Sequence, residues 1–113
     1  MVAVQLTDKS GRWFDTETAI RLTERTWHDG SNQISANTGS QWSHEGLWCT
    51  RKGNWILEQD SDSSIRYTLL DDAVAIQWIS HNDIYGDGDG EEFKLLPETV
   101  QRVIMVQLKG MEL

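Results

Sequence analysis

The sequence predicts an α+β fold, in which a small antiparallel sheet of about four strands has one or two helices packed on one face. Three features of the 113-residue chain support this class. The segment LWCTRKGNWIL, residues 47–57, has two short aromatic and aliphatic runs around a glycine-containing turn, which is typical of a β-hairpin. Residues 19–27 and 64–70 alternate apolar with polar side chains, as strands with one face in water do. After residue 70 the apolar spacing changes to that of a helix.

The first of these strands is expected over AIRLTERTW, residues 19–27. Ile20 and Leu22 form its apolar side, and the arginines and threonines between them are expected to face water. The segments HDGSN (28–32) and NTGSQ (37–41) contain residue types that favour turns. A single strand that ends in a turn is therefore predicted upstream of the hairpin.

The hairpin itself has a glycine where the chain must reverse. Gly53 is placed to take a positive φ, which glycine adopts without a steric penalty. Because side chains alternate along a strand, Leu47 and Cys49 share one face, and Trp48 and Thr50 share the other. The hairpin therefore has two distinct faces, each with an aromatic or aliphatic side chain to bury.

A helix is predicted over AVAIQWIS, residues 73–80, directly after the last strand. Asp71 or Asp72 can cap its first turn by accepting a hydrogen bond from a free backbone N–H. Its valine, isoleucine and tryptophan side chains form a broad apolar face. His81 and Asn82 are expected to end it.

The C-terminal segment, residues 97–109, has features of both kinds of element. Pro97 near a first turn with Glu98 beside it favours a helix, and Gly110 would then follow its end. Its β-branched valines and isoleucine favour a strand instead. The helix is the preferred interpretation.

One resemblance can be placed on these elements. The run TGSQWSHEGLWCTRKGNWIL, followed by YTLLDDAVAIQW, resembles small uncharacterised bacterial proteins with a similar order of hairpin, strand and helix. It covers roughly residues 29–82 and implies no activity. It supports a single compact domain over residues 1–113, within which residues 83–92 form an acidic, glycine-rich loop.

The charge of the chain is uneven along its length. The formal net charge is −8, and residues 1–57 hold six acids and six bases, whereas residues 58–113 hold twelve acids and four bases. An acidic half repels a phosphate backbone, so direct nucleic-acid binding is disfavoured, and it attracts a basic protein partner. Solubility alone would also explain the acidity. Cys49 is the single cysteine and no apolar run is long enough to span a membrane, so a soluble cytoplasmic protein is expected.

The acidic loop has three interpretations. The calcium-binding EF-hand loop needs oxygen ligands at its first and twelfth positions, and with Gly90 as the sixth these positions are Tyr85 and Leu96. The segment is therefore no EF-hand. An irregular calcium site, a solvated loop and a surface for a basic partner remain open; the calcium site would use Asp83, Asp87, Asp89 and Glu91.

Other catalytic signatures are incomplete. His44 and Glu45 begin a metalloprotease-like pattern, but Trp48 stands where the second histidine is required. Cys49 alternates with aromatic residues in a predicted strand and is expected to be a small buried hydrophobe rather than a nucleophile. No glycine-rich nucleotide motif opens a helix, so no cofactor is expected.

Six tryptophans are many for this length, and five of them divide into two groups. Trp55 and Trp78 lie in patterned elements and are predicted to be core residues. Trp13, Trp27 and Trp42 lie near turns, where one or two of them could be exposed as anchors for a partner or as platforms for sugars.

These observations favour a small acidic protein-binding module without enzymatic activity. It would act as an inhibitor or antitoxin-like partner of a basic, nucleic-acid-handling protein. The expected contacts are Asp83, Asp87, Asp89, Glu91, Glu92 and Trp42. The first alternative is a small-ligand-binding protein or enzyme with a pocket between sheet and helix, around His44, Glu45 or Tyr67. The second alternative is an irregular calcium-binding protein, and self-association is compatible with each of the three.

Overall fold

The computed structural model describes residues 1–82 and 91–113 and has the predicted α+β class. The strands are β1 (Ala3–Gln5), β2 (Trp13–Asp15), β3 (Ile20–Thr23), β4 (Thr26–His28), β5 (Gln33–Ser35), β6 (His44–Cys49), β7 (Trp55–Ser61) and β8 (Ser64–Leu70). The helices are α1 (Asp72–His81), α2 (Glu91–Lys94) and α3 (Glu98–Gly110).

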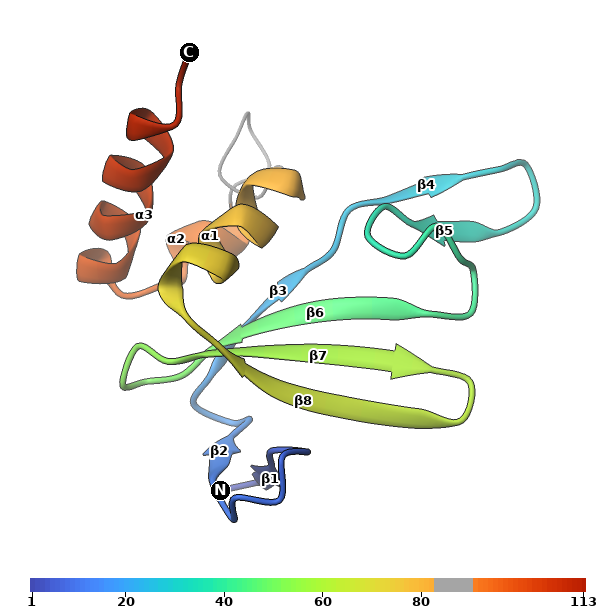
Figure 1. The fold of residues 1–113 in the computed structure, drawn as a ribbon, viewed down its shortest axis with the longest axis horizontal. Coiled ribbons are helices and arrows are strands. Elements are labelled where there is room, and N and C mark those ends of the chain that lie inside the picture. The colour runs from blue at the N-terminus through green and yellow to red at the C-terminus, as the bar shows by residue number, and fades with distance from the viewer. Residues whose placement is uncertain (83–90) are drawn as a thin grey trace.

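The central element is a four-stranded antiparallel sheet in the order β3-β6-β7-β8. The pairs β1-β2 and β4-β5 form two separate two-stranded sheets (Figure 1). The predicted hairpin is β6-β7, in which Leu47 lies opposite Leu57 and Cys49 opposite Trp55. Gly53 in its turn has a φ of 88°, as the sequence predicted.

The sheet is covered on both faces. On one face Leu22, Leu47, Cys49 and Trp55 pack against the three helices in the main core. The other buried residues of this core are Ala75, Ile76, Trp78, Ile79, Phe93 and Ile104 from the helices and Leu96 from the segment between α2 and α3. On the other face Ile56 packs against residues of the N-terminal hairpin in a second, smaller core that contains Leu6 and Phe14 and is flanked by Trp48 and Tyr67. Figure 1 shows the helices and the β1-β2 hairpin on opposite sides of the sheet.

The two predicted helices are confirmed. Asp71 caps α1 by accepting a hydrogen bond from the backbone N–H of Val74 at 2.9 Å. The segment 98–110 is helical, and among its residues Ile104 is the one that is fully buried. Val103 and Val106 are exposed, so the β-branched residues that suggested a strand lie mainly on the outer side of this helix. Gly110 is its last residue rather than the one after it.

Both edges of the central sheet are partly occupied. At the β3 edge the Glu92 carboxylate accepts hydrogen bonds from the backbone N–H of Thr23 at 3.0 Å and from its hydroxyl at 2.7 Å. At the β8 edge the backbone N–H of Thr7 donates to the Tyr67 carbonyl at 2.9 Å, and the Tyr67 N–H donates to the Thr7 hydroxyl at 2.7 Å. Such contacts limit edge-to-edge pairing with a second chain.

The prediction of one strand over residues 19–27 is wrong. The chain forms β3 and β4 with a break at Glu24 and Arg25, because the Glu24 side chain is buried in a polar cluster and the Arg25 N–H donates to a side chain rather than to a strand. Arg21 does not face open water either. It forms an ion pair with Glu58 at 3.0 Å and lies over the ring of Trp48.

The sequence did not reveal β1, β2, β5 or α2. The acidic loop predicted over 83–92 lies mostly outside the described residues. Its last two residues, Glu91 and Glu92, form the first turn of α2.

Candidate functional site

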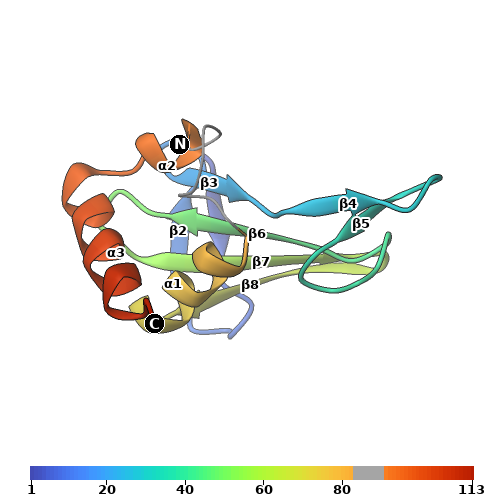
Figure 2. The ribbon, with the colours of Figure 1, turned by 90° about the horizontal axis from the view of Figure 1, so that it is seen from above.

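The most distinctive feature of the surface is a projection at one end of the sheet. The β4-β5 hairpin extends away from the body of the molecule, and a loop then returns the chain to β6 (Figures 1 and 2). We call residues 26–43 the arm. Its two tryptophans are exposed, with 54% of Trp27 and 61% of Trp42 accessible to solvent.

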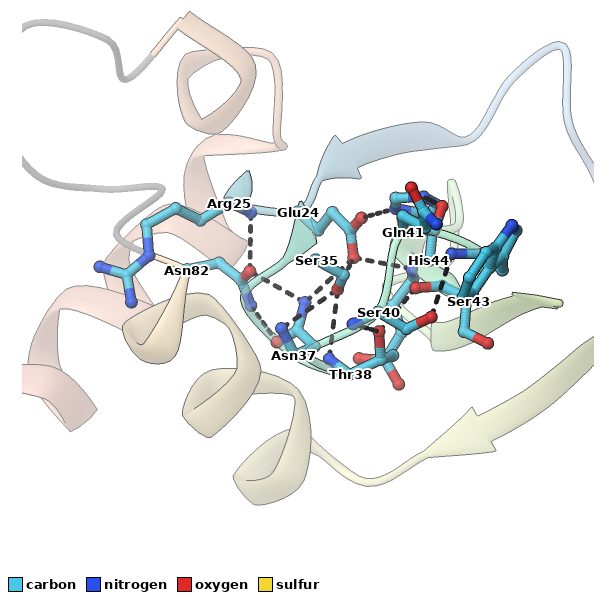
Figure 3. A network of polar contacts seen from close by, with 12 residues as sticks. Glu24, Arg25, Ser35, Asn37, Thr38, Ser40, Gln41, Ser43, His44 and Asn82 are labelled. Atoms are coloured by element: carbon cyan, nitrogen blue, oxygen red, sulfur yellow. Dashed lines mark hydrogen bonds and ion pairs between the residues drawn. The ribbon is translucent and has the colours of Figure 1, made fainter. Parts of the chain in front are cut away.

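A buried carboxylate joins the arm to the sheet (Figure 3). Glu24 lies just before the arm and is almost fully buried. It accepts hydrogen bonds from the Ser35 hydroxyl at 2.6 Å, the Glu45 backbone N–H at 2.8 Å and the Asn37 amide at 3.4 Å. Its second oxygen lies 2.6 Å from Nδ1 of His44. One side chain therefore links both strands of the arm's base to β6.

Asn82, at the end of α1, joins the same network from the helical side (Figure 3). Its carbonyl oxygen accepts from the Arg25 N–H at 2.8 Å and from the Asn37 amide at 3.0 Å. Its own amide donates to the Asn37 side-chain oxygen at 3.0 Å and to the Trp78 carbonyl at 2.8 Å. Asn82 therefore fixes the arm to the helix as Glu24 fixes it to the sheet.

The ring of His44 is held between two acceptors. Its Nδ1 faces the Glu24 carboxylate, and its Nε2 lies 2.8 Å from the Gln41 carbonyl. The hydrogen bond to Glu24 raises the pKa of His44, more than burial lowers it. Burial alone raises the pKa of Glu24, but the hydrogen bonds from Ser35, Glu45, His44 and Asn37 outweigh it and leave that pKa lowered. Because both ring nitrogens face acceptors, the arrangement fits an imidazolium paired with a carboxylate.

This network has the residue types of a hydrolase triad without its geometry. A nucleophilic serine must contact the histidine that removes its proton. Here the Ser35 hydroxyl donates to Glu24 instead, and Ser35 is completely buried.

The contacts of the network hold the loop of residues 35–43 in one conformation. Two further hydrogen bonds lie within this loop: the Thr38 hydroxyl donates to the Ser43 carbonyl at 2.6 Å, and the Trp42 N–H donates to the Ser40 hydroxyl at 3.0 Å.

The predicted contact residues do not all fall in the described part of the chain. Asp83, Asp87 and Asp89 lie outside it, so neither the partner surface nor the calcium site proposed for them is tested. Glu91 is exposed in the first turn of α2, and Glu92 is half-buried against Thr23. Within residues 1–82 and 91–113, no three or more acidic, histidine or cysteine side chains are placed to hold a metal ion. Trp42 is exposed on the arm.

The pocket residues proposed for a small ligand have other roles. His44 belongs to the polar network, and the Glu45 carboxylate accepts from the Trp78 indole at 3.0 Å and the Gln59 amide at 3.3 Å. Tyr67 packs edge-on against Phe14. A hollow of about 930 Å³ does exist, but it lies between the N-terminal hairpin and the turn of residues 50–54, and none of these three residues lines it.

The prediction of Trp55 and Trp78 as core residues is confirmed, and all three tryptophans near turns, rather than one or two, are exposed. Trp55 and Trp78 belong to the main core, and Trp13, like the two tryptophans of the arm, is more than half exposed. Cys49 is buried as predicted, and burial, with a smaller effect of Asp72, raises the pKa of its thiol to about 11. Such a thiol is a poor nucleophile at neutral pH.

Sequence reasoning missed Glu24 and Asn82, the two residues at the centre of the network. Asn82 comes after the apolar pattern of the predicted helix ends, so the pattern gives no signal of its burial. Glu24 follows Ile20 and Leu22 in the alternation, which places it on the apolar side of the segment, but glutamate is a residue type that is rarely buried.

Among the residues that the structure describes, no helix has the length and apolarity needed to cross a membrane. Family models, curated proteins and solved structures were compared with the chain, and none of them matches it.

Proposed function

We propose that this protein is a protein-binding module without catalytic activity and that the arm is its recognition surface. The observation that carries this proposal is the exposure of Trp27 and Trp42 on a projection that a buried polar network holds in place. Tryptophan is enriched among the residues that contribute most to binding energy at protein interfaces.

The composition of the arm supports recognition of a protein. The segment 28–43 is HDGSNQISANTGSQWS, in which serine, asparagine, glutamine, threonine and glycine surround a tryptophan. Antibody binding loops have a similar mixture, because aromatic residues supply rigid contact area and small polar residues supply adaptable hydrogen bonds. The network supports the same function in energetic terms, since a surface ordered before binding loses less entropy when the complex forms.

The charge of the chain supports a basic partner. The arm itself is nearly neutral, with Asp29 as its only acid, and that carboxylate accepts from the Ser31 and Asn32 N–H groups in the β4-β5 turn. The net charge of −8 lies in the second half of the chain. In this proposal the acidic half accelerates encounter with a basic protein, and the arm then supplies the contacts that last. Such charges would suit an inhibitor of a nucleic-acid-handling protein, because carboxylates can occupy the positions on that protein where the phosphates of its nucleic acid would bind.

Capture of partners from the native host tests the recognition surface. The bait is compared with Trp27→Ala, Trp42→Ala and, as a matched control, Trp13→Ala. Trp13 is as exposed as Trp27 but lies on the N-terminal hairpin. A protein captured by the wild type and by the control, and lost from both arm variants, supports the proposal. Equal capture by all four baits, or loss only with Trp13→Ala, contradicts it.

The role of the acidic segment has a separate test. Reversal of Asp83, Asp87 and Asp89 to lysine should weaken binding of the captured protein and flatten its dependence on salt concentration. Reversal of Glu17, Asp62 and Glu98, which are exposed and lie elsewhere in the chain, gives an equal change in net charge. If the two triple variants bind alike, only net charge matters and the acidic segment is not a contact site.

A further inference from the structure

We propose that the hollow beside the N-terminal hairpin is a binding site for a small organic anion with an aromatic body. Its volume of about 930 Å³ is within the range of small-molecule sites, roughly 300–1,000 Å³. It lies on the face of the sheet opposite the helices, between the β1-β2 hairpin and the β6-β7 turn. The arm does not contribute to it, so this site is independent of the proposed recognition surface.

The wall and floor of the hollow are apolar. Leu6 and Phe14 of the hairpin meet Ile56 and Leu69 of the sheet there, and Trp13 stands at the rim with 53% of its surface exposed. An exposed indole next to an apolar floor is suited to stacking on a flat ring. The ligand should therefore have an aromatic body rather than a purely polar one.

The rim of the hollow is cationic, although the protein is strongly acidic. Arg51 and Lys52 occupy the β6-β7 turn, and within residues 1–82 and 91–113 neither lies within ion-pair distance of a carboxylate. Arg12 lines the opposite wall and pairs with Asp8 at 3.0 Å. The lining contains one acid, Asp15, whose carboxylate already accepts hydrogen bonds from the N–H groups of residues 2 and 17. A carboxylate, sulfonate or phosphate on the ligand would complement this rim.

The wall that carries Arg12 and Trp13 is held in place before any ligand binds. The loop of residues 6–12 docks on the edge of β8 through the reciprocal hydrogen bonds between Thr7 and Tyr67. Within the loop, Asp8 accepts from the Ser10 N–H at 2.9 Å. Lys9 has a φ of 62°, a left-handed conformation that costs energy for a residue with a Cβ and that the surrounding contacts must maintain.

Anilinonaphthalene sulfonate is a suitable probe, because it has an aromatic body and one anionic group and its fluorescence increases in an apolar site. The double variant Arg51→Gln/Lys52→Gln removes the unpaired cations from an exposed turn and should leave the fold unchanged. It should bind the probe about tenfold more weakly, since each partly solvated charge pair contributes a factor of about three. Phenylnaphthylamine, the uncharged analogue, should bind the wild type and this variant equally.

Two further variants separate this hollow from other apolar surface. Lys109→Gln removes a cation from a shallower hollow at the end of α3, lined by Met105, Val106 and Met111, and should leave the affinity for the sulfonate unchanged. Trp13→Ala should weaken both probes, because it removes part of the apolar wall. The proposal is overturned if the sulfonate does not bind, if Lys109→Gln weakens it as much as the double variant does, or if the double variant binds it like the wild type.

Discussion

Replacement of Glu24 with alanine tests whether the polar network holds the arm. The substitution leaves two donors without an acceptor, the buried Ser35 hydroxyl at 2.6 Å and the partly buried Glu45 backbone N–H at 2.8 Å. Each such donor without a partner costs about 1–3 kcal/mol, so a loss of roughly 2–6 kcal/mol in the free energy of unfolding is expected. The ion pair with His44 adds little to this figure, because the His44 side chain is 36% exposed and its charge is partly solvated.

Urea denaturation followed by circular dichroism measures this loss, and amide hydrogen exchange locates it. Exchange of the Glu45 and Arg25 amides should accelerate most, since both donate to side chains of the network. The matched control is Glu98→Ala, which removes an exposed glutamate paired with Arg102 and should cost less than about 0.5 kcal/mol. If Glu24→Ala costs no more than this control, the network does not stabilise the arm and the reasoning is refuted.

Three further predictions concern pH, the thiol and a close contact. The folded pKa of His44 is raised above 6.5, so its contribution to stability is complete below pH 6.5 and is lost as pH rises through the folded pKa. The folded pKa of Glu24 is lowered below 4.5, so its contribution is complete above pH 4.5 and is lost as pH falls through the folded pKa. Protection of the arm from hydrogen exchange should therefore be greatest between pH 4.5 and pH 6.5, and His44→Gln should abolish the decline at high pH. Cys49, with a pKa of about 11, should react with iodoacetamide at neutral pH only after unfolding, and rapid labelling of the native protein, seen by mass spectrometry, would show that the thiol is accessible. A Cβ at Gly46 would lie 2.5 Å from the Arg21 guanidinium, so Gly46→Ala should displace Arg21 and cost about 1 kcal/mol in a thermal or urea unfolding experiment. In an Arg21→Ala background the same change should be neutral or stabilising, and an equal cost in both backgrounds would contradict this explanation.

The elements that the sequence revealed are those defined by local pattern. The β6-β7 hairpin has a glycine turn between two apolar runs, and α1 has an aspartate cap before an apolar face. Both signals involve residues close together in the chain, so neither depends on tertiary contacts. The β1-β2 hairpin has strands of only three residues each, and its pattern is too short to distinguish from a loop.

The polar network could not be predicted in this way. Glu24, Ser35, Asn37, His44 and Asn82 come from four separate parts of the chain, and the fold brings them together. Glu24 follows Ile20 and Leu22 in the alternation and so falls on the apolar side of that segment, but glutamate is rarely buried, so the alternation alone does not predict a buried carboxylate. The hollow at the N-terminal hairpin depends on the docking of the loop of residues 6–12 onto β8, a contact between segments about sixty residues apart.

Recognition by the arm, as proposed above, requires that the arm is ordered in the free protein. Nuclear magnetic relaxation measures this directly through the order parameters of the backbone amides in residues 26–43 and of the indole N–H groups of Trp27 and Trp42. Because the network fixes the arm, we expect backbone order parameters near 0.85, as in rigid secondary structure, and a marked decrease in Glu24→Ala. Values below about 0.6 in the wild type would show that the network does not preorganise the arm, which contradicts its proposed role as a rigid recognition surface.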